Sequence, residues 1–417
     1  MGSGSPRRFD LYRVVSARFV SRAGSEAAFF VGIWGKAAYA LHASPGQLAF
    51  IMFAMAAGSI LGSIVAGVLV DRYGPRRVLA VAELVFVPAA LGMAFAHSLP
   101  VLTALVGVWA LAGAPVVTAG ASFAPFLTLD PDELPRVNAR IESTGSLAML
   151  TGPALGAAVA HFAGVDWVFV IDAATSLLAA VLVWRVVLRP VARHDEERHP
   201  LHELSAGLRA TYAIRPVRYY VLVGTVAWFS FGAFGVLEPL FFRDVVHTGV
   251  ETLGWINTVF GAGLLLGAAL LPRLPRSLVS ARGLVGFLVL NGLGAIAYVG
   301  SSDLRRVVAG ALVWGLVIGA LDPLLRTLVH RDTPEGLVGR VVGTSEVHRR
   351  AGELVPLAFA PAIALRFGVQ ATLIGGGLLG AALALSSLGE AAAIDRLPHR
   401  DVPAERLSPE EPLSPNR

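Results

Sequence analysis

The segment Gly67-Val68-Leu69-Val70-Asp71-Arg72-Tyr73-Gly74-Pro75-Arg76-Arg77-Val78-Leu79 decides the fold of this 417-residue chain. It lies between two long apolar runs and therefore predicts a very short connection between two membrane-spanning helices. A carboxylate at the end of one helix can interact with the positive N-terminus of a neighbour, and arginines favour the cytoplasmic surface. Its glycines allow close helix approach and a tight turn. We expect a cytoplasmic gate made of Gly67, Asp71, Arg72, Gly74, Arg76 and Arg77.

The composition indicates a membrane protein. Hydrophobic residues make up 55% of the chain and charged residues 15%, and the mean hydropathy is +0.66, whereas soluble domains carry about a quarter charged residues. The net charge of +5 does not indicate nucleic-acid binding, because the arginines fall in loops between apolar runs. The chain has no cysteine for a disulfide or a thiolate metal site. Without a P-loop, a zinc motif or a nucleophile elbow, the sequence predicts no enzyme, no metal site and no cofactor other than a proton gradient.

Twelve apolar segments reach the roughly 20 residues that one membrane span needs. We expect spanning helices near residues 12–40, 46–70, 78–97, 100–127, 137–162, 166–186, 217–242, 251–271, 283–300, 305–329, 340–365 and 369–390.

A charged segment divides the twelve spans into two sets of six. We expect a six-helix bundle over residues 1–186, a cytoplasmic linker over 187–216, a second six-helix bundle over 217–390 and a disordered tail over 391–417. The linker predicts an amphipathic helix on the membrane surface, from the helical spacing of Leu201, Leu204, Leu208 and Tyr212.

The placement of basic residues predicts the orientation in the inner (cell) membrane. With both termini cytoplasmic, roughly 25 basic residues fall inside. The outer loops then hold Lys36, Arg243, Arg305, Arg306 and Arg366.

The opening segment has the form G-x-L-x-D-R-x-G-x-R-R-x-x-L, which resembles the loop signature between helices 2 and 3 of the major facilitator superfamily. Pro75 departs from it, because the family usually has a basic residue there. Four further segments look like the twelve-helix drug:proton antiporter branch, which includes macrolide and enterobactin exporters. They are Asp132–Ala139, Gly152–Gly156, Phe169–Ser176 and Pro334–Arg340.

The resemblance implies an all-α major facilitator fold of twelve transmembrane helices in two six-helix bundles. It further implies a proton-coupled, monomeric exporter of amphipathic small molecules (drugs, antibiotics or siderophore-like compounds) that works by alternating access. Gly152, Pro153 and Gly156 match the core of the antiporter signature, whose bend would close the outward end. A kink without directional meaning is the alternative, since proline breaks a helical hydrogen bond in any case.

Charged residues within the predicted spans are the candidates for proton coupling, since each costs roughly 2.5–3.5 kcal/mol at the bilayer centre. Glu26 falls near the midplane with Arg22 one turn earlier, which suits either a proton carrier or a permanent ion pair. Glu353 and Asp172 are the next candidates, although Asp172 could instead serve a capping or gating role. Glu83 is expected near the inner surface, in contact with water or loop residues.

The helix predicted over 340–365 carries an unusual number of charges. Two i,i+4 pairs are possible there, between Glu346 and Arg350 and between Arg349 and Glu353. We favour cargo or proton handling over a purely structural role. Glu238 is expected near the outer rim, where it would serve the cargo cavity and mainly the outer gate.

Aromatic residues of the seventh span suit an apolar cargo pocket, although core packing is their more common fate. The candidates are Trp228, Phe231 and Phe234. Two other functions remain open. One is an uptake symporter or lysophospholipid transporter of the same fold, and the other is a non-transporting membrane receptor.

Overall fold

The computed structural model describes residues 8–128, 130, 132–188 and 200–397, and these residues form helices without a strand. In the N-terminal bundle, the first spanning segment is α1 followed by two π-helical segments. The elements are α1 (Arg8–Ala27), η1 (Ala28–Ile33), η2 (Gly35–Ala40), α2 (Pro45–Tyr73), α3 (Pro75–Ala94), α4 (Leu99–Ala121), the short α5 (Ala124–Leu127), α6 (Leu134–Ala163) and α7 (Val165–Trp184).

The C-terminal bundle follows a surface helix, α8 (Pro200–Ala213), and ends before a short helix, α15 (Leu388–Ile394). Three short 3-10 segments lie in its connections. The bundle consists of α9 (Arg215–Phe241), η3 (Phe242–Val246), α10 (Val250–Leu270), η4 (Leu271–Arg273), η5 (Arg276–Leu278), α11 (Ala281–Val299), α12 (Leu304–Arg331), η6 (Glu335–Leu337), α13 (Val338–Phe367) and α14 (Val369–Ser386).

Within the described residues, ten helices are long and apolar enough to cross a membrane. The other two long helical segments are α1 with its π-helical extension and α13. Both carry charged residues that lower their hydropathy, but the 30 residues of α13 extend for about 45 Å. The twelve predicted spans therefore correspond to twelve long helices, and the chain is a multi-pass membrane protein.

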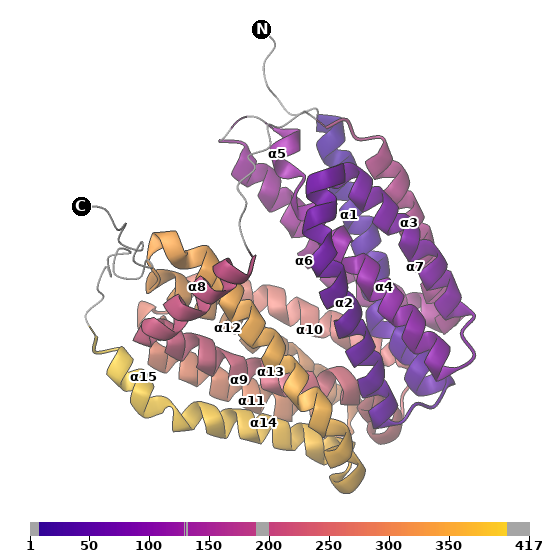
Figure 1. Ribbon diagram of the computed structural model, residues 1–417. Coiled ribbons are helices and arrows are strands. Elements are labelled where there is room, and N and C mark those ends of the chain that lie inside the picture. Colours follow the sequence, from indigo (N-terminus) through magenta and orange to yellow (C-terminus); the bar gives the residue numbers. More distant parts are fainter. Residues whose placement is uncertain (1–7, 129, 131, 189–199, 398–417) are drawn as a thin grey trace, which may run out of the picture.

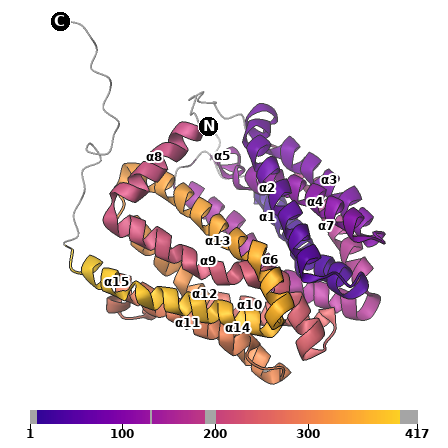
Figure 2. The same cartoon turned by 60° about the horizontal axis from the view of Figure 1, so that its bottom comes forward.

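The two bundles repeat one packing scheme. In the N-terminal bundle α2 packs on α4, α3 on α7 and α1 on α6, and in the C-terminal bundle α10 packs on α12, α11 on α14 and α9 on α13. The two bundles lie side by side and diverge toward one end (Figures 1 and 2). We call this end, where α1 begins and where the α2–α3 turn, α8 and α15 lie, the terminal side. The opposite end is called the closed side.

Gly74 makes the tight turn that the opening segment predicts. It connects α2 and α3 with φ +79° and ψ 155°, a conformation that favours glycine because a Cβ atom would be strained there. Pro75 follows as the first residue of α3, where its missing N–H costs no helical hydrogen bond. The predicted connection is therefore as short as the sequence implies.

The helix predicted in the linker corresponds to α8, which packs against α13. After the last helix of the C-terminal bundle, the chain remains helical beyond the predicted boundary at residue 390. Ala391 and Ile394 of α15 are buried, and α15 packs on α11, so an apolar face orders a segment that its charge alone predicts to be disordered. The rest of the predicted tail, 398–417, lies outside the described residues, as does linker segment 189–199.

Candidate functional site

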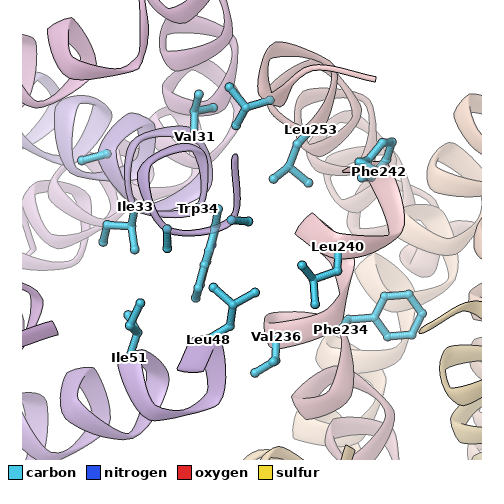
Figure 3. Close-up of a cluster of buried hydrophobic side chains, with 14 of the residues drawn as sticks. Val31, Ile33, Trp34, Leu48, Ile51, Phe234, Val236, Leu240, Phe242 and Leu253 are labelled. Atoms are coloured by element: carbon cyan, nitrogen blue, oxygen red, sulfur yellow. The ribbon is translucent and has the colours of Figure 1, made fainter. Parts of the chain in front are cut away.

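Apolar side chains from both bundles fill the interface on the closed side. Trp34 and Leu48 of the N-terminal bundle lie opposite Val236 and Leu240 of the C-terminal bundle (Figure 3). All four side chains are almost fully buried. Burying such side chains stabilises a contact by about 1.5–3 kcal/mol each, so this cluster holds the closed side together in the present conformation.

The predicted helix-bending motif lies at the same interface. Gly152 of α6 packs so closely on α1 that an added Cβ would overlap Glu26, and a Cβ on Gly156 would lie 3.0 Å from the Ala27 carbonyl oxygen. The carbonyl oxygen of Pro153 lies 2.7 Å from the position of a Cβ on Gly254 of α10. The motif therefore joins three helices of two bundles, on the side that the resemblance assigns to outward closure.

On the terminal side, glycines of α2, α6 and α13 face open space. Apart from chain neighbours and the nearby backbone of the same helix, no described atom lies within 4 Å of a Cβ added to Gly67, Gly145, Gly339 or Gly343. The close approach expected at Gly67 is therefore absent in this conformation. These glycines of the two bundles therefore leave the terminal side open within the described residues.

The predicted gate residues are on the open, terminal side and are not engaged across it. Asp71 is exposed and has no hydrogen bond or ion pair with any described residue. Arg72 lies over the ring of its neighbour Tyr73, at 5.4 Å, and Arg77 is exposed. Arg76 donates to the carbonyl of Val186 at 3.0 Å, which ties the α2–α3 turn to the end of α7.

Glu26 and Arg22 form the ion pair that their spacing predicts, with Nε and Oε1 2.6 Å apart. The Glu26 side chain is buried and that of Arg22 is half exposed. Because Glu26 contacts Gly152, and the next residue Pro153 contacts α10, Glu26 lies at the inner edge of the contact between the bundles. The Arg22–Glu26 ion pair thus lies at the boundary between the buried interface of the closed side and the open terminal side.

The charges of α13 form one connected network. Arg349 binds Glu353 at 2.6 Å and also Glu346, and Arg350 binds Glu346 at 3.2 Å. Arg349 also lies 4.6 Å from the ring centroid of Trp228, in α9. Cation–π contacts of this kind contribute about 0.5–2 kcal/mol. The two predicted i,i+4 pairs are therefore present, and two further ion pairs, Arg349–Glu346 and Arg350–Glu353, connect them.

Glu353 occupies a position in the C-terminal bundle similar to that of Glu26. Its main-chain carbonyl packs directly on Gly232 of α9, and one turn further along α9 Gly235 contacts Met52 of α2. The charged groups of α1 and α13 thus both lie beside interbundle contacts. The similar placement of Glu26 and Glu353 results from how the helices pack, and the spacing of residues along one helix does not predict it.

The aromatic candidates have different surroundings. Trp228 lines a small cavity of about 20 Å³ with Asn291 and Asp322, which is room for about one water molecule. Phe234 is buried against Trp314, with ring centroids 4.5 Å apart, so in this conformation it belongs to the packed core. The side chain of Phe231 lies outside the described residues.

Glu238 lies on the closed side, beside Tyr298 of α11. Tyr298 donates a hydrogen bond to Glu238 Oε1 at 2.5 Å. Phe241 and Phe242 pack around the ring of Tyr298.

Asp172 is fully buried inside the N-terminal bundle. It accepts hydrogen bonds from Trp109 Nε1 at 3.0 Å and from Ser25 Oγ at 3.2 Å. Glu83 of α3 is also buried, with 1% of its surface exposed, so the expectation of a solvated Glu83 is wrong. The position of Glu83 near the start of α3 predicts contact with solvent. The packing of α3 along α7 instead shields the Glu83 side chain from water.

Lys36 is a buried residue whose contacts cannot be found from helical spacing. It lies in η2, and its Nζ donates to Asp166 Oδ1 at 2.7 Å and to the Ala94 carbonyl at 2.9 Å. The distribution of basic residues predicts an outer loop at this position, whereas the structure places the side chain inside the bundle. The position of Lys36 at the end of a long apolar run is the sequence feature that indicates a buried cation. A buried cation needs a carboxylate partner.

The family model described as Major Facilitator Superfamily matches residues 14–355 of the chain. Among curated proteins, the chain is 26% identical over 348 residues to the multidrug efflux pump Tap of Mycobacterium tuberculosis, covering 79% of this chain and 82% of that protein. It is 27% identical to the multi-drug resistance efflux pump PmrA of Streptococcus pneumoniae, covering 76% and 79%. It is 26% identical to the enterobactin exporter EntS of Escherichia coli, covering 72% of each chain.

Solved structures with the same fold include a D-xylose-proton symporter, with a TM-score of 0.72, 12% identity, and coverage of 93% of this chain and 98% of that one. A bacterial homolog of the human lysosomal transporter Spinster, in an inward-facing and occupied conformation, gives a TM-score of 0.71, 14% identity, and coverage of 95% and 100%. At these identities the likeness extends to the fold alone. The expected fold of two six-helix bundles is confirmed.

Proposed function

Because the chain belongs to the Major Facilitator Superfamily, we propose that it exports amphipathic small molecules in exchange for protons, by alternating access. The observation that carries the proposal is the position of two sets of charged side chains. Arg22 and Glu26 on α1, and Arg349, Arg350 and Glu353 on α13, lie beside the interbundle contacts. Charged groups at membrane depth are expected to face an aqueous passage or one another.

The direction of transport is proposed from the relatives and from the motif in α6. Two of the similar curated proteins are named as multidrug efflux pumps and one as an enterobactin exporter. In this chain Gly152, Pro153 and Gly156 hold the closed side together through α1 and α10. With both termini cytoplasmic in the inner membrane, the closed side is the outer side, and the present conformation is open to the cytoplasm to accept cargo.

In the proposed cycle, cargo binds between the bundles from the cytoplasmic side and the bundles rock to open outward. The gate residues Asp71, Arg72, Gly74 and Arg76 then close the cytoplasmic side. A proton entering from outside returns the carrier to the inward-open state. Glu26 is the first proton-carrying residue, with Glu353 and Asp172 next, and the protein works as a monomer.

The decisive experiment uses the purified full chain in proteoliposomes with an imposed pH gradient. Ethidium and enterobactin serve as the probes, one cationic and one a siderophore. We expect a gradient with the acidic compartment on the periplasmic face to drive either probe toward that compartment, and transport to stop when a protonophore removes the gradient. Transport of both probes in the direction of proton flow would show that the protein is a symporter and not an exporter. No transport of either probe would refute the proposal for these cargo classes.

A further inference from the structure

Two buried carboxyl groups lie inside the N-terminal bundle, away from the ion pairs of α1 and α13. Counting about 1.5 Å per residue, Glu83 lies about 12 Å from the terminal-side end of α3 and Asp172 about 18 Å from the corresponding end of α7. Neither forms an ion pair with any residue that the structure describes. This sets them apart from Glu26 and Glu353, which each bind an arginine.

The two groups are close enough for their charges to interact, and Arg18 is the other charged residue that faces Glu83. Ser176, one helical turn after Asp172 on α7, lies beside Glu83, as does Ser21 of α1. Two carboxylates that interact in a low-dielectric interior cannot both remain ionised at low cost. The pair is thus expected to hold a proton.

The hydrogen bonds indicate which of the two groups holds it. Both oxygens of Asp172 accept hydrogen bonds, from Ser25 and from Trp109, as a carboxylate requires. In contrast, Glu83 Oε2 and Ser176 Oγ are buried and have no hydrogen-bond partner among the described residues. Asp172 is therefore the better stabilised carboxylate, and the proton is assigned to Glu83, whose protonated Oε2 can donate to Ser176 Oγ, a hydroxyl that can donate or accept.

We propose that Glu83 and Asp172 form one buried proton-binding site in the N-terminal bundle, with the proton on Glu83 in the conformation open on the terminal side. This inference rests on the proposed proton coupling, to which it adds a site that does not touch the cargo. It makes Glu83 a proton-binding residue and Ser176 the residue that positions its proton.

The site has a connection to the open side through Arg18. The Nη1 atom of Arg18 is buried against Gly120 of α4 and has no hydrogen-bond partner among the described residues. The Nη2 atom of Arg18 is 3.9 Å from Glu142 of α6. When Glu83 loses its proton, the new carboxylate attracts Arg18 and competes with Glu142. Proton release would thereby change a contact between α1 and α6, the pair of helices that also carries Glu26 and Gly152.

Infrared difference spectroscopy of the full chain in lipid, recorded over a pH titration without any cargo, tests the site. We expect the carbonyl-stretch band of a protonated, water-excluded carboxylic acid in the wild type, and loss of that band in Glu83→Gln. Asp322→Asn is the matched control, because Asp322 is ion-paired with Arg326 at 3.0 Å and should not contribute to the band. An unchanged band in Glu83→Gln would overturn the assignment.

A second variant and a change of salt complete the spectroscopic test. If Glu83→Gln does not give a folded protein by size-exclusion chromatography, Ser176→Ala is measured instead. Removing the hydroxyl that accepts the proton should shift the frequency of the carboxylic-acid band. An unchanged frequency would refute the site. Replacing sodium chloride by choline chloride should leave the band unaltered, whereas a band that appears only without sodium would reassign the site to a metal cation.

Transport is then measured separately, with ethidium as the probe. Loss of the band in Glu83→Gln together with loss of pH-gradient-driven ethidium export supports both the site and its role in coupling. Loss of the band with unaltered, proton-driven export would leave the proton site standing but overturn its role in coupling. If the wild type exports no ethidium, the proposed function fails for this cargo, whereas the spectroscopic result on Glu83 still decides the site.

Discussion

Arg243 of the C-terminal bundle donates a hydrogen bond from Nη1 to the main-chain carbonyl of Ala38 in the N-terminal bundle, at 2.6 Å. Ala38 lies in η2, near the end of a helical segment where carbonyls lack intrahelical donors. Asp244 holds the Arg243 guanidinium in place through Nε, at 2.6 Å. The contact joins the bundles on the closed side and can exist only while that side is closed.

Replacing Arg243 with alanine is expected to shift the conformational equilibrium toward opening of the closed side. A hydrogen bond from a charged donor contributes about 1.5–3 kcal/mol, so the shift should be roughly tenfold or more. The chain has no cysteine, so spin labels at Ala40→Cys and Thr248→Cys can report the distance across the interface. Arg306→Ala, at an exposed position on the same side, is the control, and equal distance distributions in both variants would contradict the role of Arg243.

Asp71→Asn is expected to leave membrane insertion intact and to slow turnover. In the outward-open state the carboxylate would act on a helix N-terminus, an interaction of about 0.3–1 kcal/mol and up to about 2 kcal/mol where partly buried. In the present conformation Asp71 has no ion pair or side-chain hydrogen bond with a described residue to lose, so the variant should favour the conformation described here. Spin labels at Tyr73→Cys and Val342→Cys would measure this, and normal transport by Asp71→Asn would remove the gate assignment.

Glu26→Gln is expected to abolish the dependence of export on the pH gradient. The variant removes the titratable group but keeps its volume, and half-exposed Arg22 can remain solvated, so folding should tolerate the change. Glu390→Gln breaks the exposed ion pair with Arg215 on the terminal side and serves as the control. Ethidium flux in vesicles with and without an imposed gradient decides, and a Glu26→Gln protein that still responds to the gradient would exclude Glu26 as the proton carrier.

Gly152→Ala is expected to destabilise the fold by about 1–3 kcal/mol, as overpacked positions do. The added Cβ would overlap Glu26 Cβ and approach the Ala23 carbonyl. Gly145→Ala, two turns earlier on α6, faces open space and should be neutral or slightly stabilising, because alanine favours a helix over glycine. Thermal unfolding in detergent compares the two, and equal midpoints would show that the α1–α6 crossing is not tightly packed.

The sequence by itself determined the number of spans, the division into two sets of six and the short turn at Gly74. These features depend on local physics, since span length follows from the bilayer and the turn follows from the missing Cβ of glycine. The ion pairs Arg22–Glu26 and Arg349–Glu353 are also local, because residues four apart share one face of a helix. Such predictions need no knowledge of which helices are neighbours.

Only the tertiary structure decided which charged groups are buried and what they contact. The distance along the chain from a helix end predicts solvent or a loop around Glu83 and Lys36, but their surroundings depend on neighbouring helices that are distant in sequence. The same holds for the Arg243–Ala38 contact, which joins residues about 200 positions apart. Burial and partners arise when helices pack, and a one-dimensional pattern of hydrophobicity does not encode the order in which they do so.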